Sequence, residues 1–355
     1  MSDALEDIAT RFATYFQAHM DGATDVAVHD VVRIHGGASR QTYRLRIAYK
    51  LNDRDVEERL ILRRDPESSL IETERSTEVD ALRAFQGSNV PVPKIHFLES
   101  DPKWLDRPFF VMEEITDCAA GRVFQPLPYG EHRQKVGEVF WRSLGHIHAP
   151  AIEDLNLSDA FVRPARNEAW HVALDHWENV IDEDQLEPQP LVRAAIRWLR
   201  RNPPPPAERI TFIHGDYRHG NFLVRDDGEL RAILDWEMCH LGDPLEDLAW
   251  GLDTIWSVDG DHPGGMIPEE EALELWAEVS GLKADPAALL WWKIFTAVKG
   301  SAIWISSARE FAEGRNMDPV IAFSGWYPAQ AHSESLIELM KLARVGARTG
   351  ADHEA

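Results

Sequence analysis

The chain has 355 residues, of which 44% are hydrophobic, and its 60 Asp and Glu against 37 Lys and Arg give a formal charge of −23. This length suffices for about two domains with a sizeable core, and the acidic excess argues against nucleic-acid binding, which needs clustered basic side chains. The two cysteines form no CxxC pattern, so a disulfide framework and a cysteine-rich zinc site are both excluded.

The apolar pattern indicates neither an N-terminal signal peptide nor a membrane-spanning segment. The first residues, MSDALEDIATRF, are acidic and lack the apolar run of a signal peptide. The most apolar stretch, residues 287–298, contains Lys293 and is shorter than the roughly 20 residues that cross a bilayer. We therefore expect a cytoplasmic protein with no membrane contact.

Residues 1–113 are predicted to form a small antiparallel sheet with one inserted helix. Residues 4–19 place apolar side chains at helical spacing and predict an opening amphipathic helix. A Gly-Gly turn then separates two β-type runs within residues 31–50, and ERLILRR at 58–64 adds another short strand. A helical pattern follows over residues 70–85, and the segments 90–98 and 108–115 read as two further strands.

Residues 114–355 are predicted to be mostly helical. Apolar positions repeat at helical spacing through residues 136–148, 170–180 and 190–199, and helices dominate again from residue 269. The chain is therefore expected to be an α+β protein of two lobes, 1–113 and 114–355, of which the second carries 22 basic and 40 acidic residues. Seven of the 13 tryptophans lie between Trp250 and Trp326, where they either pack a core or line a substrate pocket.

The segment of residues 212–250 carries the strongest functional signal. Asp216 follows a short apolar strand within the sequence HGD, and Asn221 comes five residues later. An Asp227-Gly228 pair between two apolar runs then predicts a hairpin, which would return Asp235 to the side of Asn221.

The three oxygen-bearing side chains of Asp216, Asn221 and Asp235 would thus converge. Hard oxygen ligands suit Mg²⁺, which takes its remaining ligands from water and nucleotide phosphates. With Asn221 and Asp235 on the metal, Asp216 can orient an attacking hydroxyl and accept its proton, which is the minimum that phosphoryl transfer needs. A surface hairpin that carries these residues by chance is the alternative.

The motif HGDxxxxN followed by DWE resembles the aminoglycoside phosphotransferase and choline kinase family, small-molecule kinases with the protein-kinase-like fold. The resemblance implies ATP and Mg²⁺ as cofactors, a small-molecule hydroxyl acceptor, Asp216 as the catalytic base, and Asn221 and Asp235 as metal ligands. It also implies that His214 braces the loop and that Asp247 supports it from the next helix. Glu237 either assists the metal or faces solvent.

Asp243 and Glu246 have a structural interpretation. Asp243 precedes Pro244 and is expected to be the N-cap of a helix, with Pro244 at its first position and Glu246 completing a capping box.

In the first lobe, the resemblance places the nucleotide loop at Gly36, Gly37, Ala38 and Ser39. The family's phosphate-binding lysine falls at Arg63, which is a departure, although arginine is permanently charged and can hold phosphate through two donors. Its acidic partner would be Glu78, with Glu74 as the alternative. The backbone near Met112 and Glu113 would meet the adenine.

The acceptor is less clearly indicated. The segments GGASRQTY, ILRRDP and GDYRHGN look like the branch formed by the kinase-like domains of acyl-CoA dehydrogenase family members 10 and 11, which implies a hydroxyacyl-CoA or a related hydroxylated metabolite. Arg40 departs from that branch, where many relatives carry Asn. Arg218, Lys299 and Arg309 are candidates to contact a phosphate or thioester arm.

Two other functions stay open at this point. The charge of −18 on residues 114–355 favours a cationic acceptor, such as an aminoglycoside, a macrolide or an amino alcohol. A nucleotide-binding pseudokinase is the other alternative, because the usual lysine is absent.

Overall fold

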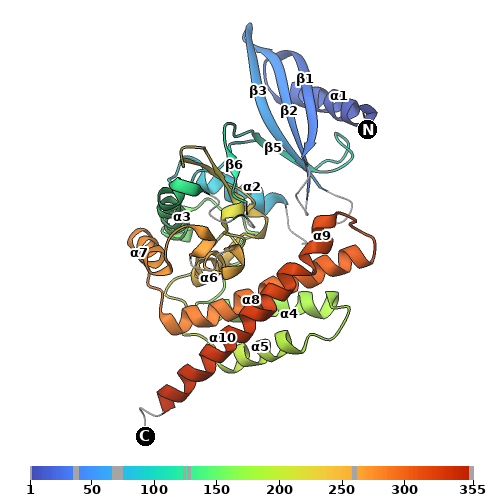
Figure 1. Ribbon diagram of the computed structural model, residues 1–355. Coiled ribbons are helices and arrows are strands. Elements are labelled where there is room, and N and C mark those ends of the chain that lie inside the picture. Colours follow the sequence, from blue (N-terminus) through green and yellow to red (C-terminus); the bar gives the residue numbers. More distant parts are fainter. Residues whose placement is uncertain are drawn as a thin grey trace. The chain divides into compact units, whose positions relative to one another are not determined.

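The computed structural model describes residues 2–34, 40–65, 75–122, 125, 129–257 and 262–351 (Figure 1). Contacts between residues divide the chain into two compact units. The first comprises Met1–Gln86 and Val92–Asp117, and the second comprises Gly87–Pro91 and Cys118–Ala355. The predicted antiparallel sheet followed by a mostly helical remainder is confirmed.

The first unit is built on a five-stranded antiparallel sheet with strand order β1-β2-β3-β5-β4. Helix α1 packs beside the long strands of this sheet (Figure 1), and its Phe12 and Phe16 are fully buried against Phe109 and Tyr49. The elements are α1 (Ser2–His19), β1 (Ala23–Ile34), β2 (Gln41–Leu51), β3 (Arg54–Arg64), α2 (Arg75–Phe85), β4 (Ile95–Glu99) and β5 (Phe109–Glu113).

Two predicted segments of the first unit fall partly or wholly outside the described residues. Helix α2 begins at Arg75 in the described chain, and residues 66–74, where the predicted helix would start, are outside it. Gly36, Gly37, Ala38 and Ser39 of the predicted nucleotide loop are also outside it.

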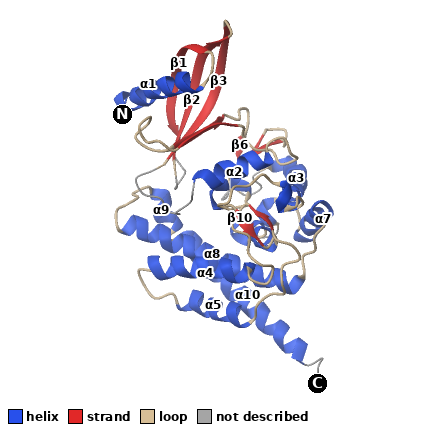
Figure 2. Ribbon diagram, turned by 180° about the vertical axis from the view of Figure 1, so that it is seen from behind, coloured by secondary structure: helices blue, strands red, loops and turns tan. Residues whose placement is uncertain are grey.

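The second unit is organised around the long helix α8, which contacts α4, α5, α6, α9 and α10 (Figure 2). This helix is surrounded because it is apolar on most of its circumference: Trp292, Phe295 and Val298 are all completely buried. The helices are α3 (Arg133–His148), α4 (Ala169–Asp184), α5 (Pro190–Arg201), α6 (Leu245–Gly251), α7 (Glu269–Ser280), α8 (Pro286–Ala312), α9 (Pro319–Ser324) and α10 (Tyr327–Ala351).

Short strands in the second unit hold the segment that carries the functional motif. Strands β6 (Ala119–Ala120), β8 (Phe222–Val224) and β9 (Leu230–Ile233) form one small sheet, and β7 (Thr211–Ile213) pairs with β10 (His240–Gly242). Six 3₁₀ turns complete the described elements: η1 (Gly130–His132), η2 (Ile152–Asp154), η3 (His219–Asn221), η4 (Trp236–Met238), η5 (Thr254–Trp256) and η6 (Pro263–Gly265).

The predicted hairpin is present between β8 and β9. Phe222 pairs with Ile233, and the backbone N–H of Leu234 donates to the carbonyl of Asn221 at 2.8 Å. Gly228 occupies the turn with φ of 78°, a conformation that glycine adopts without steric cost. The chain therefore returns beside Asn221 immediately before Asp235.

The clustered tryptophans mostly serve packing. Trp250, Trp256, Trp276, Trp291 and Trp292 are each at most 5% exposed, whereas Trp326 is 68% exposed. Among the helices that the structure describes, none is both long enough and apolar enough to cross a bilayer.

Candidate active site

The carboxylate of Asp216 is held by three neighbouring side chains of the second unit. Asn221 Nδ2 donates to Asp216 Oδ2 at 2.8 Å, Trp250 Nε1 donates to Oδ1 at 2.8 Å, and Arg218 Nε lies 3.1 Å from both oxygens. The Asp216 side chain is 14% exposed, so it is reached by solvent while its orientation is fixed by donors. Such a carboxylate can orient a hydroxyl group and accept its proton.

The backbone of the HGD loop (residues 214–221) is tied to helix α6 by Asp247. This fully buried carboxylate accepts hydrogen bonds from the backbone N–H groups of His214 at 2.6 Å and Gly215 at 2.9 Å. Burial opposes ionisation, yet the hydrogen bonds from His148 and from the backbone of Gly215 hold the pKa of Asp247 below its ordinary value. Both oxygens of Asp247 are therefore engaged by groups of the protein itself.

His214 braces the same loop from inside. Its Nδ1 accepts the N–H of Asp216 at 3.2 Å, and its Nε2 lies 3.0 Å from the carbonyl of Leu234. Because a backbone N–H can only donate and a carbonyl can only accept, the proton must be on Nε2. Complete burial lowers the pKa of His214, which favours this neutral form.

Asn221 and Asp235 present oxygen atoms suited to a hard cation. Because Nδ2 of Asn221 is bonded to the backbone and side chain of Asp216, Oδ1 is the side-chain atom of Asn221 that can ligate a metal. Asp235 follows the hairpin in the left-handed conformation with φ of 67°, which is uncommon outside glycine and gathers at functional sites.

This donor set fits Mg²⁺ that is completed by other ligands. Mg²⁺ is typically bound through one or two protein oxygens together with water and substrate phosphates. Asn221 and Asp235 together offer a number of protein oxygens within that range.

Arg218 contacts Asp216, whereas Glu237 lies in the turn that follows Asp235. The Arg218 guanidinium contacts Asp216 and lies 5.2 Å above the ring of Trp256, with its side chain 23% exposed. It thus presents a fixed positive charge beside the carboxylate. Glu237 lies in the turn η4, two residues after Asp235, and is half-buried.

In the first unit, Arg63 on β3 is paired with Glu78 on α2, the partner preferred to Glu74 from the sequence. Both are buried, and the Arg63 guanidinium also lies 5.8 Å from the ring centre of Phe110. Arg40 shares the same carboxylate, because its Nε lies 3.1 Å from Glu78 Oε2, and its Nη1 donates to Asp65 at 2.6 Å. A guanidinium fixed in this way has the donor chemistry that nucleotide phosphates require.

Met112 and Glu113 lie at the end of strand β5, which is between β3 and the edge strand β4. The N–H of Glu113 donates to the carbonyl of Lys94 at 2.9 Å, and the Glu113 carboxylate accepts the N–H of Lys94 at 2.8 Å. The backbone donor of Glu113 is therefore engaged within the sheet, so any contact from this residue to an adenine would use its carbonyl. The predicted hinge contact stays a prediction.

One expectation about basic residues is wrong. Lys299 cannot meet a phosphate or thioester arm, because it is 1% exposed and bonded to Glu246 and to the carbonyl of Gly215. Arg309 pairs with Asp184 and Glu313 while its side chain is 28% exposed, and its contact with an acceptor stays a prediction.

The expected capping by Asp243 is seen, but the capping box with Glu246 is wrong. Asp243 Oδ1 accepts the N–H of Leu245 at 3.0 Å, as a capping side chain does, although helix α6 begins at Leu245, one residue later than expected. Glu246 is buried and pairs with Lys299 and His240, so tertiary pairing takes the side chain that local capping would have used.

Trp250 and Lys299 are functional candidates whose roles the sequence analysis missed. Trp250 contacts Asp216 across 34 residues, and Lys299 contacts Gly215 across 84. No motif spacing marks such pairs, because both depend on how α6 and α8 pack.

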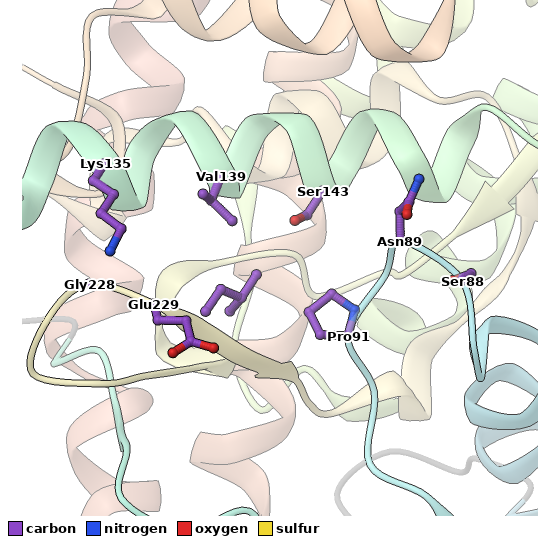
Figure 3. Close-up of a pocket in the computed structure, with 9 residues that line it drawn as sticks. Ser88, Asn89, Pro91, Lys135, Val139, Ser143, Gly228 and Glu229 are labelled. Carbon is purple, nitrogen blue, oxygen red and sulfur yellow. The ribbon is translucent and has the colours of Figure 1, made fainter.

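A separate cavity of about 320 Å³ lies in the second unit, between helix α3 and the β8–β9 hairpin (Figure 3). Lys135, Val139 and Ser143 of α3 line one side, and Gly228 and Glu229 lie opposite. None of the predicted site residues lines it, so it is distinct from the HGD loop.

The family of this chain follows from its similarity to known proteins. The model of the phosphotransferase enzyme family matches residues 30–288. The chain belongs to this family. Its predicted assignment to the small-molecule phosphotransferases is thereby confirmed.

Solved structures of this family share the fold. The chain is similar to a Ralstonia eutropha protein assigned to the aminoglycoside phosphotransferases, with a TM-score of 0.72, 19% identity and coverage of 94% of this chain and 98% of that one. It is similar to the choline kinase LicA of Streptococcus pneumoniae, with a TM-score of 0.58, 15% identity and coverage of 93% and 98%. The predicted kinase-like fold is confirmed by these likenesses.

Curated relatives are longer proteins. The chain is 25% identical over 224 residues to acyl-CoA dehydrogenase family member 10 of Mus musculus, which is 62% of this chain and 20% of that protein. It is 24% identical over 302 residues to family member 11 of Homo sapiens, which is 80% of this chain and 36% of that protein. The chain therefore spans between a fifth and about a third of these relatives.

Proposed function

We propose that this protein transfers the γ-phosphoryl group of ATP to a hydroxyl of a small molecule, with a hydroxyacyl-CoA or a related hydroxylated metabolite as the favoured acceptor. The observation that carries the proposal is the Asp216 carboxylate, which is oriented by Asn221, Trp250 and Arg218. A base held in this way matches a reaction in which positioning and charge neutralisation supply most of the catalysis.

Each residue has a distinct part in the proposed reaction. Asp216 orients the acceptor hydroxyl and takes its proton, while His214 and Asp247 hold the loop on which Asp216 lies. Asn221 Oδ1 and Asp235 would hold Mg²⁺, which when bound supplies charge neutralisation at the phosphates. In the first unit, Arg63 braced by Glu78 would hold the nucleotide phosphates. Glu237 of the second unit is assigned no step.

Three acids that pack behind the HGD loop are turned inward. Glu246 pairs with Lys299, Asp247 with backbone N–H groups, and Asp253 with His332 at 3.1 Å, and all three are at most 7% exposed. Asp216, Asp235 and Glu237 stay partly exposed, so acidic groups do remain in this region. The observation in favour of a neutral or anionic acceptor is the guanidinium of Arg218, which lies beside Asp216.

A thioester of coenzyme A is the acceptor that the relatives suggest. The relatives with sequence similarity are named acyl-CoA dehydrogenases, and this chain aligns with only a part of each. The phosphate groups of coenzyme A would complement Arg218.

A cationic acceptor is the second candidate. It is favoured by the formal charge of −23 and by structural neighbours that are described as aminoglycoside, macrolide and choline phosphotransferases or kinases. A pseudokinase is the third, and the presence of Asp216, Asn221 and Asp235 together argues against it.

Release of ADP tests these candidates directly. The purified protein is incubated with Mg·ATP and either hydroxyacyl-CoA thioesters or a set of aminoglycosides, macrolides and amino alcohols, with Asp216→Asn as the control. Turnover that requires a thioester supports the favoured acceptor, and turnover that requires a cation replaces it with the second candidate. Nucleotide binding without turnover in either set would overturn the proposed transfer to these acceptors.

A further inference from the structure

A buried lysine lies directly behind the HGD loop. Lys299, in the middle of α8, is 1% exposed, and its Nζ donates to the carbonyl of Gly215 at 2.6 Å and to Glu246 Oε1 at 2.9 Å. The ring centres of Trp250 and Trp177 lie 5.1 and 5.7 Å from the same nitrogen. Burying an ammonium group is costly unless it is paired, and here a carboxylate, a carbonyl and two aromatic faces compensate it.

Gly215 is thereby held from both sides of its peptide backbone. Its N–H donates to the buried carboxylate of Asp247 on α6, and its carbonyl accepts from the buried ammonium of Lys299 on α8. Gly215 has φ of 86°, and a Cβ at this position would lie 2.3 Å from the carbonyl oxygen of Met238. The residue immediately before Asp216 is therefore fixed by two opposite charges and by close packing.

Trp250 links these contacts of Gly215 to the carboxylate of Asp216. Its indole N–H donates to Asp216 Oδ1, and its ring faces Lys299. The position of Lys299 thus bears on Asp216 by two routes, through the Gly215 peptide and through the Trp250 ring.

We propose that Lys299 is a positioning residue for phosphoryl transfer, which sets the orientation of Asp216 through the Gly215 carbonyl and the Trp250 ring. This inference rests on the proposed function, because it assigns Lys299 to the same base. Because Lys299 is 1% exposed and bonded to Gly215 and Glu246, its removal should lower kcat and leave the KM for ATP almost unchanged.

The test uses a double variant that removes the charges of Lys299 and Glu246 together. Lys299→Met alone would leave Glu246 buried without its main partner and could prevent folding, whereas Lys299→Met with Glu246→Gln removes both charges. The matched control is Lys293→Met on the same helix, where Lys293 pairs with Glu269 at 2.6 Å away from the loop. Lys299→Arg is a further variant that keeps a cation beside Glu246 while changing the donor geometry at Gly215.

Two readouts are measured for every folded variant: steady-state ADP release, and hydrogen exchange of the backbone amides in residues 213–222. Since a misplacement of about 1 Å can cost on the order of 100-fold in rate, we expect kcat in the double variant to fall about 10- to 100-fold, with the KM for ATP within about twofold. Amide exchange should increase in residues 213–222 and stay unchanged in β2. Lys293→Met should match the wild type in both readouts.

The readouts separate this inference from the proposed function. Normal kcat and normal exchange in a folded Lys299 variant would overturn the inference, as would an increase in exchange spread evenly over the chain. If the wild type proves to transfer no phosphoryl group, the proposed function fails by that result alone. Amide hydrogen exchange in the Lys299 variants then tests separately whether Lys299 fixes the HGD loop. If exchange does not increase in residues 213–222, Lys299 does not fix the loop, and the further inference fails as well.

Discussion

The indole N–H of Trp250 donates to Oδ1 of Asp216 at 2.8 Å. Trp250 lies on α6, in the same helix as Asp247, which bonds the backbone of the HGD loop. One short helix therefore fixes both the backbone that carries Asp216 and the carboxylate itself. This arrangement reduces the freedom that the base would otherwise lose when an acceptor binds.

Replacing Trp250 by Phe isolates the hydrogen bond to Asp216. The ring, which packs against Lys299, is largely kept, so we expect kcat to fall about 10-fold, in line with the loss of one hydrogen bond to a charged group, while the melting temperature changes little. Trp291→Phe is the control, because it removes an N–H bond to the carbonyl of Leu199 in the same core. Equal effects of the two variants on kcat would show that Trp250 acts only by packing.

Asp216→Asn tests the assignment of the base. The amide keeps the size of the side chain but cannot take a proton, so kcat should fall about 10²- to 10⁴-fold. Nucleotide affinity, measured by titration with a fluorescent ATP analogue, should stay within about threefold. Asp227→Asn in the exposed hairpin turn is the control. A near-normal rate in Asp216→Asn would assign proton transfer to another group.

Arg63 gives a prediction for nucleotide binding. Arg63→Met removes the cation that Glu78 braces, and the KM for ATP should rise about 10- to 100-fold, since a bond to a charged group contributes about 1.5–3 kcal/mol. Arg63→Lys keeps the charge without the second donor and should recover part of the loss. Arg54→Met, at the exposed start of the same strand, should leave the KM unchanged. An unchanged KM in Arg63→Met would remove Arg63 from the nucleotide site.

The part of the site that could be predicted is the part that local chemistry determines. Asp227 and Gly228 specify a tight turn, and the apolar residues on either side specify two strands, so the return of the chain beside Asn221 follows from a few neighbouring residues. For this reason Asp235 directly follows Leu234, whose N–H is bonded to the carbonyl of Asn221.

The contacts that could not be predicted are those between distant elements. Glu246 satisfies the local pattern of a capping box, but packing of α6 against α8 brings Lys299 to it across 53 residues. Leaving the buried charge of Lys299 without its partner would cost more free energy than a single capping bond at a helix end contributes. The expectation that Lys299 contacts a phosphate or thioester arm fails for the same reason, since its burial depends on the Trp177 and Trp250 rings.

His240 makes the stability of this cluster depend on pH. Its Nδ1 lies 3.0 Å from the carbonyl of Met238 and its Nε2 lies 3.1 Å from Glu246. Since both partners accept, both ring nitrogens donate only in the imidazolium form. Burial alone would lower the pKa of His240, but Glu246 outweighs burial and the nearby Lys299, and the pKa is raised. His176 on α4 also faces His240 and has a lowered pKa, chiefly from burial.

A raised pKa in the folded state means that the stabilisation by His240 is complete below about pH 6.5 and is lost as the pH rises through the folded-state pKa. Urea unfolding of the wild type and of His240→Gln should therefore show a difference in free energy that shrinks between pH 6 and pH 8.5. A difference that grows over this range would mean that His240 is neutral when it contacts Glu246.

Asp243 gives a second prediction of pH dependence, in which the substitution stabilises the protein increasingly as the pH rises. Burial raises the pKa of Asp243 to about 6, although its Oδ1 accepts the N–H of Leu245. The folded-state pKa of Asp243 is above the unfolded value of about 3.9. The contribution of Asp243 to the free energy of unfolding is therefore fully present below about pH 3.9 and is lost as the pH rises through about 6. Asp243→Asn keeps the acceptor and avoids the buried charge. Its unfolding free energy relative to wild type should therefore rise by about 1 kcal/mol between pH 5 and pH 8.

The control for Asp243→Asn is Asp285→Asn, which changes an exposed N-cap whose side chain accepts the N–H of Ala288 at 2.8 Å. Both substitutions remove one acidic charge and keep a side-chain acceptor, so they alter the net charge of the protein equally. Only the buried position should produce a gain that increases with pH in urea unfolding. An equal gain in both variants would assign the effect to the overall acidic charge, which destabilises the compact chain by self-repulsion, and not to the burial of Asp243.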